Sequence, residues 1–240
     1  MLNQSFHCRY LVIFSIFLLS QLAVACSSQP QLLSGAAADP NAALVRSLET
    51  DSSINVSASS TTGEQSVVLA GGCFWGVEAV FEKLQGVTNV VSGYAGGTAT
   101  AANYEAVSNG NTGHAEVVKV SYNPQQISLG QLLKIYFLIA HDPTEIVRQG
   151  PDTGKQYRSA IFFANSDQQK VATAYINKLN QAKVFPRPIA TRLESFSKFY
   201  AAEDYHQNFI DRNPNYPYVV INDLPKIAQL RQQFPKMVKP

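Results

Sequence analysis

The 240-residue sequence contains few cysteines, few charged residues and one tryptophan. Its three cysteines are Cys8, Cys26 and Cys73, and only 15% of its residues are charged, with a formal net charge of +2. Basic residues do not cluster with aromatic ones. The composition therefore predicts no strongly charged partner and argues against nucleic-acid binding.

Sequence motifs for metal and phosphate chemistry are also missing. There is no HExxH segment and no close pair of cysteines, and His114, His141 and His206 are scattered along the chain. The glycine-rich stretch SGYAGG at residues 92–97 does not match GxGxxG and does not open a helix pattern. We therefore expect no metal ion and no resident cofactor.

The apolar run at residues 11–25, LVIFSIFLLSQLAVA, is short for a membrane span. It follows Arg9 and ends in small residues, which predicts an export signal over residues 1–25. Ordinary signal peptidase could cleave after Ala25. Alternatively, LAVAC resembles a bacterial lipobox, in which Cys26 becomes the lipidated first residue of a lipoprotein. We favour the lipobox, and expect an exported protein of the bacterial cell envelope, anchored by lipid and facing the periplasm or the exterior.

Residues 26–64 are rich in Ala, Ser, Thr, Gln and Asn and show no hydrophobic periodicity, which predicts a flexible tether. Residues 65–240 predict one folded domain. The strand patterns are 66–70, 87–91, 114–122, 158–164 and 191–196, and the helix patterns are 77–84, 129–140, 166–182, 199–211 and 226–232. Residues 92–104 are expected to form a loop, and the tail after Asn213 to wrap the domain. This order favours an α+β fold with helices packed on a small mixed sheet.

The segment GGCFWG at residues 71–76 places Cys73 between an expected strand and an expected helix. A lone cysteine is commonly an inert core residue. However, the unpaired N–H groups at a helix start favour a thiolate, and the preceding glycines leave room for another molecule. The segment therefore favours a reactive thiol, beside which Phe74 and Trp75 could hold a small apolar group.

A thiol that attacks a polar centre needs a proton donor, and Glu116 is the candidate. Period-two alternation in HAEVVKV puts Glu116 on the same strand face as Val118 and Val120. A carboxyl on an apolar face has a raised pKa and can donate a proton near neutral pH. A surface carboxylate paired with a lysine remains an equal alternative on this pattern alone.

Taken together, the motifs of residues 67–225 resemble those of a known family. GCFWG, YAGG, NYE, GHAEVV, HDPT, RQGPDTGKQYRSAIF and AEDYHQNF occur in this order, and the set resembles peptide methionine sulfoxide reductase A. The resemblance implies a ferredoxin-like two-layer α/β plait with extra strands and an irregular C-terminal coil. It also implies thiol-dependent reduction of the S epimer of methionine sulfoxide, in proteins and as the free amino acid.

The resemblance assigns roles to seven residues. Cys73 aligns with the nucleophile, and Glu116 with the acid that protonates the sulfoxide oxygen. Tyr104 and Tyr157 align with two further catalytic residues, whose hydroxyls hydrogen-bond that oxygen. The remaining three align with substrate-binding groups: the methyl-binding wall of Phe74 and Trp75, and Asp152, which helps to orient the main-chain N–H of the substrate. His206 is expected to be structural.

The sequence departs from many relatives because no cysteine follows Cys73. Those relatives use a C-terminal cysteine to resolve the sulfenic acid that forms on the nucleophile. We therefore expect a monomeric one-cysteine enzyme, whose sulfenic acid is reduced by an external thiol such as thioredoxin, and whose substrates are oxidised methionine-containing proteins. Two other functions stay open: a non-catalytic envelope lipoprotein that binds methionine-rich or oxidised segments, and a general thiol peroxidase or disulfide oxidoreductase.

Overall fold

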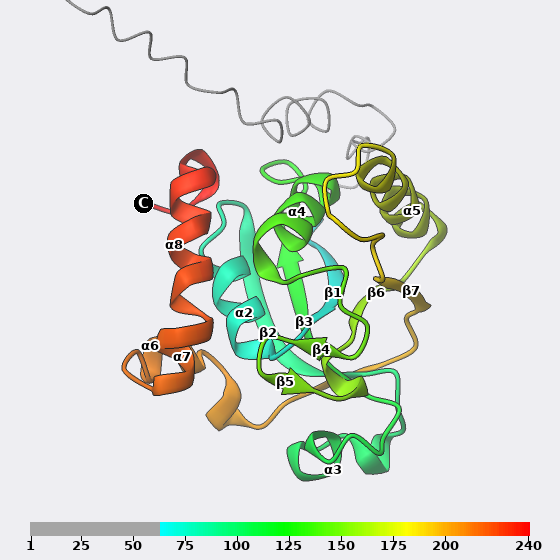
Figure 1. Ribbon diagram of the computed structural model, residues 1–240, viewed down its shortest axis with the longest axis vertical. Helices are drawn as coiled ribbons and strands as arrows, with labels where there is room; N and C mark the ends of the chain where they lie inside the picture. The colour runs from blue at the N-terminus through cyan, green and yellow to red at the C-terminus, as the bar shows by residue number, and fades with distance from the viewer. Residues whose placement is uncertain (1–62) are drawn as a thin grey trace, which may run out of the picture. The chain divides into compact units, whose positions relative to one another are not determined.

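The computed structural model describes residues 63–240. The predicted export signal, the lipidation site Cys26 and nearly all of the predicted tether lie outside these residues. The described part is built on one six-stranded sheet, with helices packed against it (Figure 1). This arrangement confirms the α+β class.

The main sheet has the strand order β7-β6-β1-β3-β2-β8, and a separate hairpin pairs β4 with β5. The strands are β1 (Gln65–Gly71), β2 (Val87–Ala95), β3 (Ala115–Tyr122), β4 (Arg148–Gln149), β5 (Asp152–Thr153), β6 (Ser159–Phe163), β7 (Arg192–Ser195) and β8 (Phe199–Ala201). Only β6 and β7 pair in parallel, and all other neighbours are antiparallel. The sheet is therefore mixed, as the sequence predicted.

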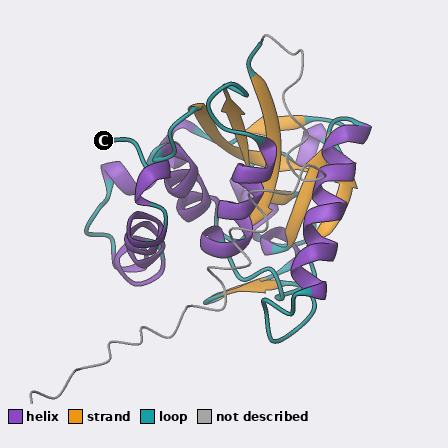
Figure 2. Cartoon of the chain, turned by 90° about the horizontal axis from the view of Figure 1, so that it is seen from above, coloured by secondary structure: helices purple, strands orange, loops and turns teal. Residues whose placement is uncertain are grey.

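Helices lie on one face of this sheet and at its edge (Figures 1 and 2). They are α2 (Phe74–Glu82), α3 (Tyr104–Ser108), α4 (Leu129–Ile135), α5 (Ser166–Gln181), α6 (Phe209–Arg212), α7 (Pro217–Asn222) and α8 (Leu224–Gln233). A π-helical turn, Tyr136–Ala140, continues α4. Side chains of α2, α4, α5 and α8 pack with one face of the sheet to form the main core.

Local signals in the sequence explain where several helices begin. Ser128 accepts a hydrogen bond from the N–H of Gln131, whose side chain bonds back to the N–H of Ser128, so a capping box starts α4. Asn165 caps α5, whose first residue, Ser166, is where the predicted helix pattern begins. These contacts satisfy backbone donors that a helix start otherwise leaves unpaired.

The chain between β7 and α7 departs from the expected helix at residues 199–211. It forms β8, a 3₁₀ turn at Asp204–His206 and the short helix α6. Residues 199–201 pair instead with β2, whose predicted end at residue 91 is also wrong because the strand continues to Ala95. Asn208 then takes a left-handed φ of 52°, which interrupts any helix there.

The tail after Asn213 carries α7 and α8, so it is less irregular than the expected coil. The helix expected at residues 226–232 is α8. Leu230 of α8 is fully buried against the main core, and Lys239 N–H donates to the carbonyl of Lys83 at the end of α2. The tail therefore packs along α2, which carries Cys73 at its start. Among residues 63–240, no helix has the length and hydrophobicity needed to cross a membrane.

Candidate active site

Cys73 occupies the junction of β1 and α2, as the sequence predicted. It is the N-cap residue of α2 and is partly exposed. Gly72 before it has φ +90°, and a Cβ there would lie 2.6 Å from Cβ of Gln149 in β4. Glycine is therefore required at this turn, both for the backbone conformation and for the close approach of the β4–β5 hairpin.

Several neighbouring groups act on the pKa of the Cys73 thiol. Burial raises the pKa of the Cys73 thiol well above its ordinary value. Negative charge on Glu116, when that carboxyl is ionised, and on Asp223 and Asp152 raises it further. The N–H of Trp75 acts in the opposite direction, as a helix start should, but its effect is smaller. The helix start therefore lowers the pKa of the Cys73 thiol, as expected, but burial has the larger effect and favours the neutral thiol.

Glu116 lies on β3 opposite Tyr94 of β2 and is 2% exposed. Its Oε2 accepts a hydrogen bond of 3.0 Å from the N–H of Phe74, in the first turn of α2. Burial raises the pKa of this carboxyl to about 8, and Asp152 adds to the increase. The alternative of a surface carboxylate paired with lysine does not hold. Glu116 is buried beside the residue that follows Cys73, and at neutral pH it carries a proton.

The seven predicted site residues line one cavity of about 210 Å³. Its walls come from β1–α2, α3, β3, β5 and the 3₁₀ turn Lys155–Tyr157, together with the C-terminal tail. The lining residues are Cys73, Phe74, Trp75, Tyr104, Glu116, Asp152, Tyr157, Tyr216 and Tyr218. Residues more than 100 positions apart thus meet around the sulfur and the protonated carboxyl.

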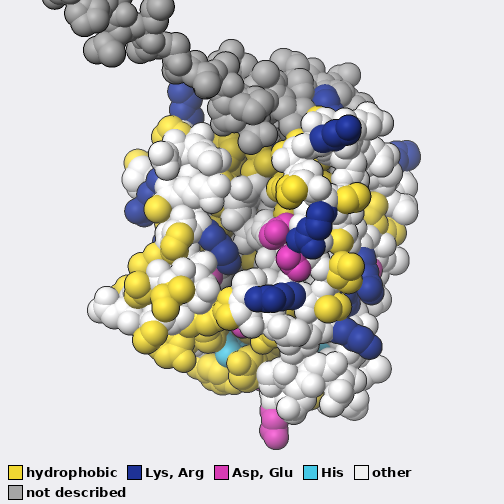
Figure 3. All heavy atoms as spheres, in the orientation of Figure 1, with side chains coloured by type: hydrophobic (Ala, Val, Ile, Leu, Met, Phe, Trp, Pro, Cys, Tyr) yellow, Lys and Arg dark blue, Asp and Glu magenta, His cyan; other side chains and the backbone are white. Residues whose placement is uncertain are grey.

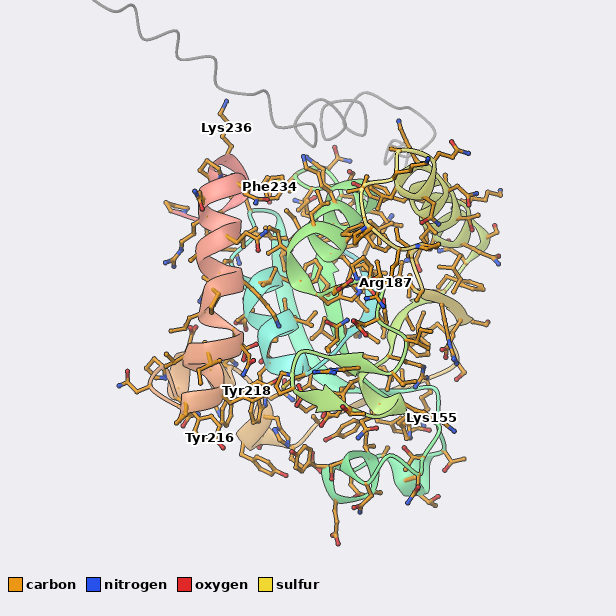
Figure 4. The ribbon with its side chains drawn as sticks, viewed as in Figure 1. Lys155, Arg187, Tyr216, Tyr218, Phe234 and Lys236 are labelled. Atoms are coloured by element: carbon orange, nitrogen blue, oxygen red, sulfur yellow. The ribbon has the colours of Figure 1, made fainter. Side chains whose placement is uncertain are left out.

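Tyr216 and Tyr218 were not found by sequence reasoning. The hydroxyl of Tyr218 donates a short hydrogen bond to Oδ2 of Asp152, and both tyrosines present ring edges to Trp75. Figure 4 shows the two tyrosines together where the tail begins, near the β4–β5 hairpin. The signal was the alternation of tyrosine and proline in NPNYPY, but local sequence does not say which surface such a tail covers.

The aromatic wall is held from behind by the tail. The indole of Trp75 stacks on Phe209 with ring centroids 3.7 Å apart, and its Nε1–H donates to Nδ1 of His206 at 3.0 Å. His206 is buried, burial lowers its pKa, and it also packs against Phe74. Because Nδ1 accepts a hydrogen bond, the neutral ring carries its proton on Nε2. His206 therefore fixes the orientation of Trp75.

Glu203 anchors the wall that carries Tyr104. Its Oε1 accepts from the N–H of Tyr104 at 2.9 Å, and its Oε2 accepts from the hydroxyl of Tyr94 at 2.8 Å. One carboxyl thus ties the start of α3 to β2. Sequence reasoning missed it, because Glu203 lies nearly 100 residues from Tyr104.

The described residues contain no group of three or more His, Cys, Asp or Glu side chains that could hold a metal ion. The cavity instead combines a sulfur, a protonated carboxyl, phenol hydroxyls and an apolar wall. Figure 3 shows hydrophobic side chains gathered over α6 and α7, at the side of the molecule where the tail tyrosines lie. Such a site suits a small substrate with one strongly accepting oxygen and one apolar substituent.

Comparison with known proteins agrees with this arrangement. The family model described as peptide methionine sulfoxide reductase matches residues 65–238. The peptide methionine sulfoxide reductase MsrA 2 of Synechocystis sp. is 50% identical over 186 residues, covering 78% of this chain and 87% of that protein. A protein of the same name from Mesorhizobium japonicum is 51% identical over 175 residues, covering 73% of this chain and 90% of that protein.

A solved structure gives the same result. The crystal structure of Mxr1 from Saccharomyces cerevisiae in reduced form is 36% identical and superposes with a TM-score of 0.59, covering 65% of this chain and 90% of that one. The chain therefore belongs to the peptide methionine sulfoxide reductase A family.

Proposed function

We propose that this chain reduces the S epimer of methionine sulfoxide to methionine through a sulfenic acid on Cys73. Membership of the family makes the chain a peptide-methionine (S)-S-oxide reductase, a repair enzyme for oxidised proteins. The observation that carries the mechanism is the placement of Cys73 and the protonated carboxyl of Glu116 on one cavity, joined through the first turn of α2.

The proposed reaction begins when the Cys73 sulfur attacks the sulfoxide sulfur. Glu116 donates its proton to the sulfoxide oxygen as negative charge develops there, and the hydroxyls of Tyr104 and Tyr157 donate hydrogen bonds to the same oxygen. The oxygen then passes to Cys73, the sulfur–oxygen bond of the substrate breaks, and methionine leaves. The thiol proton of Cys73 passes to the Glu116 carboxylate, which thereby regains the proton that it gave to the oxygen. Cys73 is oxidised by two electrons to a sulfenic acid while the sulfoxide is reduced by two electrons, so atoms and electrons balance.

The cavity also accounts for substrate binding. Phe74 and Trp75 provide an apolar wall for the substrate methyl group, and the stacking of Trp75 on Phe209 keeps that wall in place. Asp152 also lines the cavity and is held by the Tyr218 hydroxyl, and its carboxylate can accept from the main-chain N–H of the substrate. The methyl group, the oxygen and the main chain of the substrate thus each have a separate binding site. Only one of the two configurations of the sulfoxide can occupy all three while its sulfur atom faces Cys73.

A single-turnover experiment tests this function. Each epimer of a chromophore-labelled methionine sulfoxide is mixed with reduced enzyme, and the mass of the peptide that contains Cys73 is then measured. We expect methionine from the S epimer only, with one added oxygen on Cys73. Cys73→Ser should fold normally and form no product, and a Cys73→Ser variant with normal turnover would refute the proposal.

We also propose that the enzyme acts at the bacterial cell envelope as a monomer, with residues 26–64 tethering the catalytic domain to a lipid on Cys26. The lipobox LAVAC supports this proposal. Expression in a bacterium with radiolabelled palmitate tests it. Label should enter the wild-type chain and not Cys26→Ser, and equal labelling of both would contradict the anchor.

For the fold, we infer that the core is the ferredoxin-like plait. The order β6-β1-β3-β2, with every neighbour antiparallel, supports this inference. So does the chain order, in which α2 connects β1 to β2, and α4 lies between β3 and β6. A fold-level comparison with a set of such plaits tests it, and a better match to another topology would overturn it.

A further inference from the structure

A second, larger hollow lies beside the active site. It has a volume of about 850 Å³ and is lined by Gly96, Thr112, Gly113, Val147, Lys155, Arg158, Arg192, Leu193 and Glu194. We call it the basic groove. None of its lining residues has a part in the proposed reaction.

The basic groove and the active-site cavity share one wall. Val147, just before the β4–β5 hairpin, and Lys155, just after it, line the groove, whereas Asp152 of the hairpin lines the active site. The N–H of Gly154 donates to the carbonyl of Val147 at 2.8 Å, which closes the base of the hairpin. Tyr157, two residues beyond Lys155, again lines the active site. A chain bound across this wall therefore contacts both hollows.

One charge in the groove is internally compensated. The guanidinium of Arg158 is buried and forms two hydrogen bonds to the carboxylate of Glu194, at 2.9 and 3.2 Å. It also donates to the carbonyls of Gly113 and Lys155. These contacts hold Arg158 in place, and the carboxylate of Glu194 neutralises its charge. Arg158 is therefore a structural residue of the groove and is not assigned to ligand binding.

Two other cations in the groove lack any partner. Lys155 and Arg192 are both exposed, and within residues 63–240 neither side chain forms a hydrogen bond or an ion pair. Val147 and Leu193 add apolar surface to the same groove. The groove therefore combines apolar walls with two uncompensated positive charges, which suits an acidic stretch of polypeptide.

We propose that the basic groove binds an acidic segment of the protein substrate, a few residues away from the oxidised methionine. This inference rests on the proposed function, because it names a preferred substrate class for the same active site. Lys155 and Tyr157 belong to one 3₁₀ turn that rises about 2 Å per residue, and an extended peptide rises about 3.3 Å per residue. Lys155 therefore starts about 4 Å along the turn from Tyr157, and its long side chain extends its reach, so an acidic residue within about four positions of the methionine can meet it.

The test compares three peptides that differ only in their flanks. Each has methionine-(S)-sulfoxide at its centre, with paired Glu, paired Gln or paired Lys about three residues away on either side. We expect kcat/KM to fall in the order Glu, Gln, Lys, with about fivefold between the first two at low salt, because exposed ion pairs are weak individually and screened by ions. Added salt should reduce the preference.

Variants of the two exposed cations test whether the basic groove causes the preference for acidic flanks. Arg192→Glu and Lys155→Glu should each reverse the order of the Glu and Lys peptides, after each rate is divided by that for N-acetylmethionine sulfoxide. Lys236→Glu is the matched control, since Lys236 is exposed and lies at the far end of α8 from Lys155 (Figure 4). It should preserve the order.

Either of two results would overturn the inference: equal kcat/KM for the three peptides in the wild-type chain, or an unchanged order in Arg192→Glu. Failure of the proposed function looks different, because the wild-type chain would then not reduce even N-acetylmethionine sulfoxide, which is too small to reach the groove.

Discussion

At the scale of single residues, the proton on Glu116 has two effects. In the proposed reaction it makes the carboxyl a donor to the sulfoxide oxygen, and it removes a negative charge that would otherwise raise the pKa of the Cys73 thiol. A carboxylate at this position would therefore hinder both attack and protonation. The buried, apolar setting of β3 keeps Glu116 neutral at the pH at which the enzyme works.

The first prediction concerns pH and rate. The pKa of Glu116 is about 8, so the single-turnover rate of sulfoxide reduction should decrease as pH rises through about 8, because the proton donor is lost. Glu116→Gln should react slowly, by about 10²-fold or more, and should lack this decrease. Stopped-flow measurement of methionine formation from pH 6 to pH 10 tests it, and an identical profile in Glu116→Gln would contradict it.

The second prediction concerns pH and stability. The pKa of Glu116 rises from 4.5 to about 8 on folding, so its contribution to the free energy of unfolding is most favourable below pH 4.5 and is lost as pH rises toward 8. Glu116→Gln keeps an acceptor for the Phe74 N–H and does not titrate. Urea unfolding should show the variant gaining stability relative to wild type between pH 5 and pH 9. A constant difference would show that Glu116 is not buried as a neutral acid.

The third prediction concerns Glu203, a positioning residue that does not line the cavity. Glu203→Ala frees the N–H of Tyr104 and the hydroxyl of Tyr94, so Tyr104 should lose its fixed position and kcat should fall more than KM changes. In a double-mutant cycle with Tyr104→Phe, the two effects should be less than additive. Full additivity would mean that Glu203 acts on stability alone.

At the scale of elements, the turn between β1 and α2 controls two walls of the site. It sets the position of Cys73 at the start of α2, and the absence of a side chain at Gly72 lets Gln149 of the β4–β5 hairpin approach. The hairpin in turn holds Asp152. Replacing Gly72 should therefore displace both Cys73 and Asp152.

The fourth prediction is that Gly72→Ala lowers stability by about 1–2 kcal/mol or more, because the new residue must adopt a φ of +90° and contacts Gln149. It should also raise KM by displacing Asp152. Gly63→Ala is the control, since a Cβ there meets no atom within 4 Å. The test measures the denaturant midpoint and KM of wild type, Gly72→Ala and Gly63→Ala. Equal values for Gly72→Ala and wild type would contradict this prediction.

At the scale of the whole molecule, local patterns predicted the parts of the fold that are decided locally. The strand–turn–helix around Cys73, the alternation on β3 and the cap of α4 all have short-range signals, and the structure contains each of them. Residues 199–211 lack such a signal. Their apolar residues fit a helix as well as a strand, and the free edge of β2 decides in favour of the strand.

The candidate site follows the same rule. Cys73 and Glu116 could be proposed from their own segments, whereas Tyr104, Tyr157 and Asp152 needed the family resemblance, because tyrosines and turn aspartates are common. Tyr216, Tyr218 and Glu203 could not be found at all. Their roles depend on where the tail and the β8 segment pack, which is a property of the completed fold.

The fifth prediction concerns recycling of the whole chain. Cys73 is the only cysteine among residues 63–240, Cys8 would leave with the predicted export signal, and the predicted lipid would occupy Cys26, so we expect no disulfide within the mature chain. Without reductant, the enzyme should make one methionine per chain and stop with its sulfenic acid trappable by dimedone. Cys26→Ser should behave identically. A disulfide between Cys26 and Cys73 during turnover would contradict the one-cysteine scheme.

The stacking of Trp75 on Phe209 has a practical consequence. This indole is the only one in the chain, and it bridges the substrate wall, His206 and the tail. Its emission spectrum is thus an unlabelled optical reporter with a single source. A ligand that enters the cavity, or a tail that lifts from α2, must each alter the quenching of that one fluorophore, so occupancy and tail docking can be followed in real time without any added dye.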